Sequence, residues 1–212
     1  VAEANIRNAT VTLAHLAQNG ASSGQIMKWD GAAWVVANDA TGSVLRGYAE
    51  HGTFPSAPVA GGTNAIAQGN SVLAGGNYSA VGGGNNNQIA YGADNTVLSG
   101  GRDNRVETGA GDSAIAGGWN NVIRQGAYVS SIGGGSAGGI GTNAVWSTIS
   151  GGRDNAVGEG AEYATVSGGR GHRVGSGALY ATIPGGYQNA AAGYRSYAVI
   201  RGSGPSGSIA LS

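Results

Sequence analysis

Cysteine is absent from this chain of 212 residues, so disulfides contribute nothing to its fold. Proline occurs four times, lysine only at Lys28, and charged residues make up 10% of the chain. Nucleic-acid binding draws most of its affinity from a basic stripe, so we expect no nucleic-acid partner. No apolar run approaches the roughly 18 residues that would cross a bilayer, so we expect no membrane span.

Glycine is the abundant residue, at 43 of the 212 positions, whereas ordinary proteins carry it at about 7%. The chain has no strict Gly-X-Y register and little proline, which excludes a collagen triple helix. So much glycine with so little charge indicates tight turns at regular intervals.

A 17-residue repeat runs through residues 83–202. Gly-Gly pairs begin at Gly83, Gly100, Gly117, Gly134, Gly151, Gly168 and Gly185, and Gly202 continues the series. A branched aliphatic stands two residues before each pair, and a second aliphatic column stands six residues after it, from Ile89 to a weakened Ala191. Small or polar neighbours flank the aliphatics, as in a strand with one buried face. Each repeat therefore predicts two short strands and two glycine turns.

A further column holds asparagine at Asn87, Asn104, Asn121, Asn155 and Asn189, and is interrupted by Gly138 and His172. Asparagine tolerates the left-handed backbone conformation and bonds to its own backbone, so it suits a turn between stacked strands. It would also suit an inward-facing, hydrogen-bonded ladder. Both interpretations make the column structural.

Two strands and two turns in each repeat predict one coil of an all-β solenoid, or β-roll. Ordering a residue costs roughly 1–2 kcal/mol of backbone entropy, and burying each of the two aliphatics returns only about 1.5–3 kcal/mol. Two side chains make a thin core. We therefore expect several chains to share a core, either intertwined or side by side.

The pattern Ser-x-Ile-x-Gly-Gly-x-x-Asn-x-Val, across residues 65–202, resembles the head repeats of trimeric autotransporter adhesins, whose repeat is usually shorter. The resemblance implies a homotrimer. Residues 22–35 resemble a module of phage tail fibres and fibre-like bacterial proteins, where it joins segments of a trimeric shaft. The residues themselves predict a hairpin with an Asp30-Gly31 turn, after a short helix that Asn19-Gly20 ends.

The C-terminal stretch, residues 203–212, is similar to the end that a self-cleaving intramolecular chaperone leaves on phage tailspikes and fibres, where the last residue is a serine, here Ser212. Mosaic fibres of predatory bacteria are similar. The chain is thus divided into a connector module (1–40), an entry cap or small knob (41–64), β-coil repeats (65–202) and a tail (203–212).

Aromatic residues recur five positions before the glycine pair, at Tyr78 and then on consecutive repeats at Trp146, Tyr163, Tyr180 and Tyr197. Stacked at the coil rise, they predict an aromatic ladder along one edge. Such a ladder could simply pack against the next coil or a neighbouring chain. Alternatively it is a carbohydrate platform, because sugar rings stack on aromatic faces.

A variable column stands two residues after the first glycine and holds Asn85, Arg102, Trp119, Ser136, Arg153, Arg170 and Tyr187. Arg153 and Arg170 lie on adjacent coils and could bind acidic sugars or phosphates bidentately; a solvated turn is the alternative. Trp119, Arg153, Arg170 and Tyr187 join the aromatic ladder as candidate ligand-binding residues.

Catalytic and metal-binding groups do not assemble in the sequence. The three histidines stand in different segments without metal spacing. Asp103 and Asp154 share a repeat position, but three coils, roughly 14 Å, separate them. We therefore expect no catalytic residues, no metal, no cofactor and no enzymatic activity.

These features favour an extracellular fibre, on a cell surface or a virion, that attaches to a cell-surface glycan or another envelope component. A polysaccharide-degrading tailspike, with carboxylates at a groove between trimer chains, is one alternative. An ice-binding solenoid is another, because Thr148, Thr165 and Thr182 form a short column.

Overall fold

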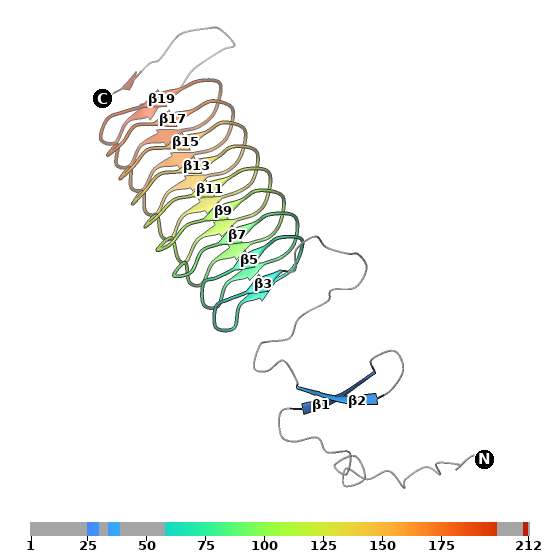
Figure 1. Cartoon of the computed structure of the whole chain (residues 1–212). Coiled ribbons are helices and arrows are strands. Elements are labelled where there is room, and N and C mark those ends of the chain that lie inside the picture. The colour runs from blue at the N-terminus through green and yellow to red at the C-terminus, as the bar shows by residue number, and fades with distance from the viewer. Residues whose placement is uncertain (1–24, 30–33, 39–57, 199–209, 212) are drawn as a thin grey trace, which may run out of the picture. The chain divides into compact units, whose positions relative to one another are not determined.

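The computed structural model describes residues 25–29, 34–38, 58–198 and 210–211, and the chain divides into two units, residues 1–43 and 44–212 (Figure 1). In the first unit, β1 (Gln25–Trp29) pairs antiparallel with β2 (Trp34–Asn38), and Trp29 stands opposite Trp34. The expected turn at Asp30-Gly31 and the short helix before the hairpin lie outside the described residues.

The second unit is an all-β solenoid, as the repeat predicts, with no helix in residues 58–198. Each coil contributes one two-residue strand to each of two sheets, so strands of one sheet lie parallel and in register (Figure 1). The odd sheet contains β3 (Val59–Ala60), β5 (Leu73–Ala74), β7 (Gln88–Ile89), β9 (Arg105–Val106), β11 (Val122–Ile123), β13 (Gly139–Ile140), β15 (Ala156–Val157), β17 (Arg173–Val174) and β19 (Ala190–Ala191). The even sheet contains β4 (Ile66–Ala67), β6 (Ala80–Val81), β8 (Val97–Leu98), β10 (Ala114–Ile115), β12 (Ser131–Ile132), β14 (Thr148–Ile149), β16 (Thr165–Val166), β18 (Thr182–Ile183) and β20 (Tyr197–Ala198), and β21 (Ala210–Leu211) pairs antiparallel with β20.

The coils at both ends are shorter than those between them. Val59 pairs with Leu73, and Leu73 pairs with Gln88, so both of these steps fall short of the full repeat. From Gln88, which pairs with Arg105, each step equals the repeat, until the pairing of Thr182 with Tyr197 shortens it again. The solenoid therefore begins at β3, ahead of the 17-residue repeat, within the stretch 41–64 that the sequence interpretation assigned to a cap or knob.

The core is closed within a single chain. The coil that starts at Ser113 buries five side chains, those of Ser113, Ile115, Asn121, Ile123 and Ala127. Both aliphatic columns and an alanine column are buried in the same way in the other full-length coils. The premise of a thin core with two buried side chains per coil is therefore wrong. Any association between chains must use the outer surface, and the homotrimer stays a prediction.

The asparagine column points inward and forms the hydrogen-bonded ladder, the second of the two interpretations. The Asn121 backbone N–H donates to Asn104 Oδ1 at 3.0 Å. The Asn121 side-chain amide donates to the carbonyls of Gly117 at 2.9 Å and Gly135 at 3.2 Å. The four asparagines from Asn87 to Asn155 each tie their own glycine turn to that of the next coil, which satisfies polar groups that would otherwise be costly to bury.

A second buried ladder, of serine hydroxyls, was not anticipated from the sequence. The Ser130 N–H donates to Ser113 Oγ at 3.0 Å, and the Ser147 N–H donates to Ser130 Oγ at 3.1 Å. The hydroxyls donate onward to main-chain carbonyls, as Ser147 Oγ does to Ala161 at 2.9 Å. The serines before β10, β12 and β14 therefore have a structural function.

His172 replaces an asparagine in the first ladder. Its backbone N–H donates to Asn155 Oδ1 at 3.0 Å, and its Nδ1 accepts the Asn189 N–H at 3.1 Å. The neutral ring must then carry its proton on Nε2, which is buried without a hydrogen-bond partner. Burial lowers the pKa of His172, against an opposing effect of the Gly186 and Gly168 carbonyls.

Candidate recognition surfaces

Three of the four consecutive aromatic residues form a stacked ladder at one corner of the coils. The rings of Trp146 and Tyr163 lie 4.8 Å apart at an interplanar angle of 10°, and those of Tyr163 and Tyr180 lie 4.7 Å apart at 6°. These separations match the spacing of about 4.8 Å between neighbouring strands, so one ring stands over each coil. The expectation of an aromatic ladder is confirmed for these three.

Tyr197 does not extend the ladder, and the expectation that it would was wrong. Because the last coil is shorter than the repeat, Tyr197 pairs with Thr182 in the even sheet, and Arg195 takes the corner position. The Arg195 guanidinium lies over the Tyr180 ring at 5.8 Å, and Tyr194 meets Tyr180 edge-on at 5.9 Å. At the other end, Tyr128 meets Trp146 edge-on at 5.2 Å.

The stacked rings leave little aromatic face for a sugar. Tyr163 has Trp146 on one face and Tyr180 on the other, and Arg195 covers the outer face of Tyr180. What remains open along the ladder is a row of ring edges. A platform on which sugar rings stack face to face is therefore not available at Tyr163. Burial, the neighbouring Tyr180 and Glu162 raise the pKa of Tyr163, so it is neutral at physiological pH.

The ladder residues hold an unfavourable backbone conformation. Trp146, Tyr163 and Tyr180 have φ of 54°, 57° and 58°, in the left-handed region that costs an ordinary residue about 1–2 kcal/mol. The same corner is filled by Asn95 and Asp112 in earlier coils, and these residue types tolerate the conformation. The left-handed conformation of the corner does not favour aromatic residues. The turn alone therefore does not explain why rings stand there.

The variable column forms a third ladder of β-bridges between coils. The sequence predicted only two short strands per repeat, and so did not predict this ladder. Its members are Asn70, Asn85, Arg102, Trp119, Ser136, Arg153, Arg170 and Tyr187, each bridged to the next. We call this the arginine–aromatic column. Arg102 lies over the Trp119 ring at 5.3 Å and Arg170 lies over the Tyr187 ring at 5.7 Å. The sequence identified these side chains as exposed, but not their pairing.

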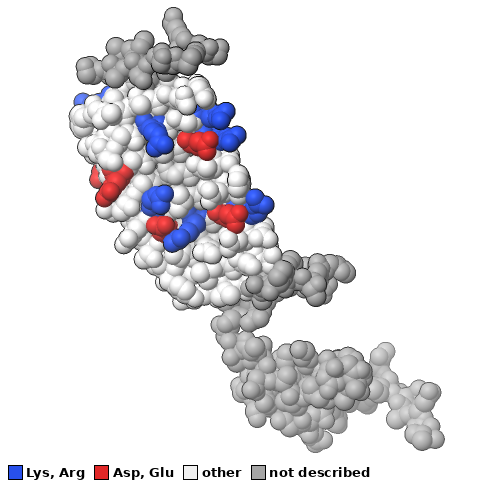
Figure 2. All heavy atoms as spheres, turned by 45° about the horizontal axis from the view of Figure 1, so that its top comes forward, with Lys and Arg blue, Asp and Glu red and all other residues white. Residues whose placement is uncertain are grey.

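Two ion pairs of the same geometry flank the column. Arg102 Nε lies 3.2 Å from Asp103 Oδ2, and Arg153 Nε lies 3.2 Å from Asp154 Oδ2. A hydrogen bond from Asn86 holds the pKa of Asp103 below its usual value, with smaller contributions from Trp119 and Arg102. Figure 2 shows such charged side chains in mixed clusters, with broad uncharged surface between them.

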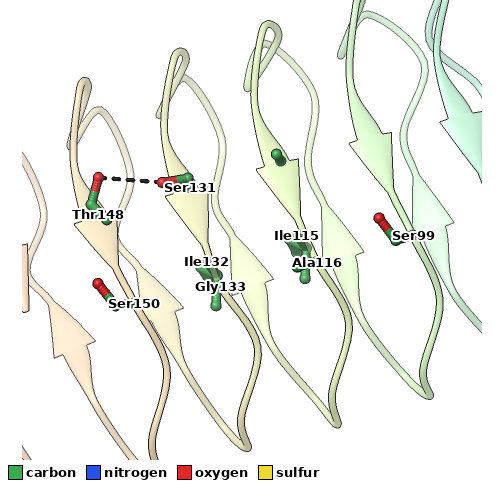
Figure 3. A pocket seen from close by; sticks show the side chains of 9 residues that line it. Ser99, Ile115, Ala116, Ser131, Ile132, Gly133, Thr148 and Ser150 are labelled. Carbon is green, nitrogen blue, oxygen red and sulfur yellow. Dashed lines mark hydrogen bonds between the residues drawn. The ribbon is translucent and has the colours of Figure 1, made fainter. Parts of the chain in front are cut away.

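The outer face of the even sheet carries no charged residue from β6 to β18. Its strands present outward Ala80, Val97, Ala114, Ser131, Thr148, Thr165 and Thr182. A shallow hollow of about 360 Å³ lies across β10, β12 and β14 (Figure 3). The hydroxyls of Ser131 and Thr148 are hydrogen-bonded across it at 3.3 Å (Figure 3). Ser99 and Ser150 add further hydroxyls, and Ile115 and Ile132 also line the hollow, which contains no charged group.

Within the described ranges, no three His, Asp or Glu side chains gather as a metal site would require. No helix there is long and apolar enough to cross a membrane. The chain matches no protein-family model and no curated protein.

Proposed function

We propose that this chain is a segment of a homotrimeric extracellular fibre that attaches to a cell-surface glycan or another envelope component, without enzymatic activity. The observation that supports it is the arrangement of recognition groups. Trp119, Arg153, Arg170 and Tyr187 stand exposed in one column on the outside of the solenoid, on coils that are bridged to one another. Aromatic and arginine side chains are the types most often found at binding hot spots.

Attachment is tested with the fluorescently labelled protein on a panel of bacterial and eukaryotic cells, with and without periodate oxidation of surface sugars. We expect saturable binding to some cells that periodate abolishes. Binding that survives periodate but is lost after proteolysis of the cell surface would instead indicate a protein component. An absence of binding across the panel contradicts the proposal. Release of reducing ends from capsular polysaccharide would support the tailspike alternative, and we expect none.

The homotrimer places the uncharged even-sheet face between chains. A regular sheet surface of small residues allows backbones to approach closely, whereas the odd sheet carries the charged side chains of Arg105 and Arg173 on its outer face. Light scattering behind a sizing column should give three times the mass of the chain. Thr165→Glu introduces a charge on the even face and should yield a folded monomer. Ala156→Glu, the matched change on the odd sheet, should leave the trimer intact. A monomeric wild-type protein contradicts this arrangement.

Ice binding is a second candidate, because the structure puts the threonine column on a regular outer surface. Thr148, Thr165 and Thr182 stand in register on adjacent strands. The same face cannot both bind ice and be buried in a trimer. A measurement of thermal hysteresis near freezing distinguishes ice binding from burial in a trimer, and we expect no hysteresis.

A further inference from the structure

The arginine–aromatic column has a gap at one coil. Ser136, half-buried, stands between Trp119 on the preceding coil and Arg153 on the following one. Its hydroxyl has no hydrogen-bond partner among the described residues. Two coil steps separate Trp119 from Arg153, or about 10 Å. The column therefore has a small residue between an indole on the preceding coil and a guanidinium on the following coil, and we call this position the slot.

Trp119 offers the slot an open ring face. Arg102 comes from the preceding coil and covers one face of the indole at 5.3 Å. No other ring or guanidinium of the described residues stacks on the indole, and Trp119 is 49% exposed. This distinguishes Trp119 from Tyr163, both of whose faces are occupied by neighbouring rings.

The indole is also held in place before any ligand arrives. Its Nε1–H donates to Asp103 Oδ2 at 3.2 Å, and the same carboxylate oxygen accepts the Arg102 Nε–H at 3.2 Å. Asp103 therefore anchors both the ring and the cation stacked upon it. A binding group held in this way loses little conformational freedom when a ligand binds.

The opposite wall of the slot supplies positive charge. Arg153 uses Nε for Asp154 and, among the described residues, keeps its two terminal amino groups free, with 63% of its side chain exposed. Arg170 follows on the next coil, stacked on Tyr187 and without a carboxylate within salt-bridge distance in the same part of the chain. Two guanidinium groups on adjacent coils favour a carboxylate or phosphate, which they bind with paired hydrogen bonds.

The spacing of the coils has room for one sugar ring. A pyranose in contact with the indole lies about 3.5–4 Å above it, and the backbones of Trp119 and Arg153 are two coil steps, about 10 Å, apart, so the long Arg153 side chain can reach such a ring. We propose that the slot formed by Trp119, Ser136 and Arg153 binds one pyranose residue that carries a carboxylate, so that the glycan recognised by the fibre is acidic. This assignment rests on the proposed attachment to a glycan.

The test compares acidic sugars with their own methyl esters, which differ only in charge at the carboxyl group. The probes are tetragalacturonate and 3′-sialyllactose, each with its methyl ester, titrated into the intact chain by calorimetry. We expect at least one acid to bind and its ester to bind about tenfold more weakly, with the acid weakened further by added salt.

Three variants then assign the site. Arg153→Gln should weaken binding of the acid about tenfold and leave binding of the ester within about twofold, because only the charge-assisted bonds are lost. Trp119→Ala should remove binding of both, because stacking is lost. Tyr163→Ala, in the aromatic ladder, should change neither. Circular dichroism checks that each variant is folded.

The outcomes separate this inference from the proposed function. If neither acid binds, if esters bind as well as acids, or if Arg153→Gln and Trp119→Ala leave acid binding unchanged, the acidic-sugar slot is refuted. Labelled protein that still attaches to cells in a periodate-sensitive way would then keep the proposed function intact. If the wild-type protein attaches to no cells, the proposed function itself is refuted.

Discussion

His172→Asn should stabilise the solenoid, because it restores the ladder at the one described position where a histidine interrupts it. The histidine Nε2 is buried without a partner, and an unpaired buried polar group costs about 1–3 kcal/mol. An asparagine amide would donate to the carbonyls of Gly168 and Gly186, as Asn155 does to those of Gly151 and Gly169. The smaller side chain loses some packing, so we expect the free energy of unfolding to rise by about 1–2 kcal/mol near neutral pH.

The gain should grow in acid. The pKa of His172 is lowered in the folded protein, so the unfolded chain, with a pKa of about 6.5, binds the proton more readily. The contribution of neutral His172 to the free energy of unfolding is therefore fully present above about pH 6.5. It decreases as the pH falls below that value, until the folded pKa is reached. At about pH 5 the loss is at most about 2 kcal/mol, since each unit of pKa difference corresponds to 1.36 kcal/mol. Protonation of Nδ1 also removes the acceptor of the Asn189 N–H.

The assay is urea unfolding followed by circular dichroism at about pH 7.5 and at about pH 5 for the wild type and His172→Asn. The difference in midpoint between the two proteins should widen on going to the lower pH. The matched control is Asn155→His, which adds a second histidine to the ladder one coil before His172 and should lower the midpoint, more so in acid. A difference between wild type and His172→Asn that is the same at both pH values would refute the titration argument. A destabilised His172→Asn would refute the ladder argument.

Two further changes probe the ladders. Gly138→Asn fills the other interruption of the asparagine column at a backbone position without positive φ. The added Cβ would lie 2.9 Å from Asn121 Oδ1, so the Asn121 side chain must shift to accept it. We expect the restored amide to outweigh that shift and to raise the urea midpoint by the equivalent of about 1 kcal/mol. Gly138→Ala, which lacks the amide, should give less, and an equal effect of both would assign the gain to backbone entropy. Tyr163→Asn removes two ring stacks of about 0.5–1.5 kcal/mol each but relieves about 1–2 kcal/mol of left-handed strain, so its thermal midpoint should stay close to that of the wild type, and a large drop would show that the stack serves stability.

The buried columns could be read from the sequence because they repeat at fixed spacing. Ile115 and Ile123 recur in equivalent form on every full-length coil, and burial of one face is what such alternation predicts. The start of the solenoid at β3, ahead of residue 65, was missed because the first coils lack that spacing. Their signal was the corner itself: Asn64-Ala65-Ile66, like Asn95-Thr96-Val97, places a turn residue, a small residue and an aliphatic in order.

The candidate site was predictable as a set of residues and not as a geometry. Exposure of Trp119 and Arg153 followed from the variability of their column. The shared anchor at Asp103 did not, because it depends on side chains from two coils reaching the same carboxylate oxygen. The loss of Tyr197 from the ladder likewise depends on strand pairing, which makes the last coil shorter than the repeat.

What the sequence alone determined is the period and the two aliphatic columns of the core, since hydrophobic alternation and glycine turns are local properties of the chain. Closure of that core within one chain required the structure, because the number of buried side chains per coil depends on how the turns fold back. The open and covered ring faces also required it. The strand spacing of about 4.8 Å is close enough for adjacent rings to stack, so a run of aromatics on consecutive coils covers its own faces, and a ring beside a small residue keeps one free.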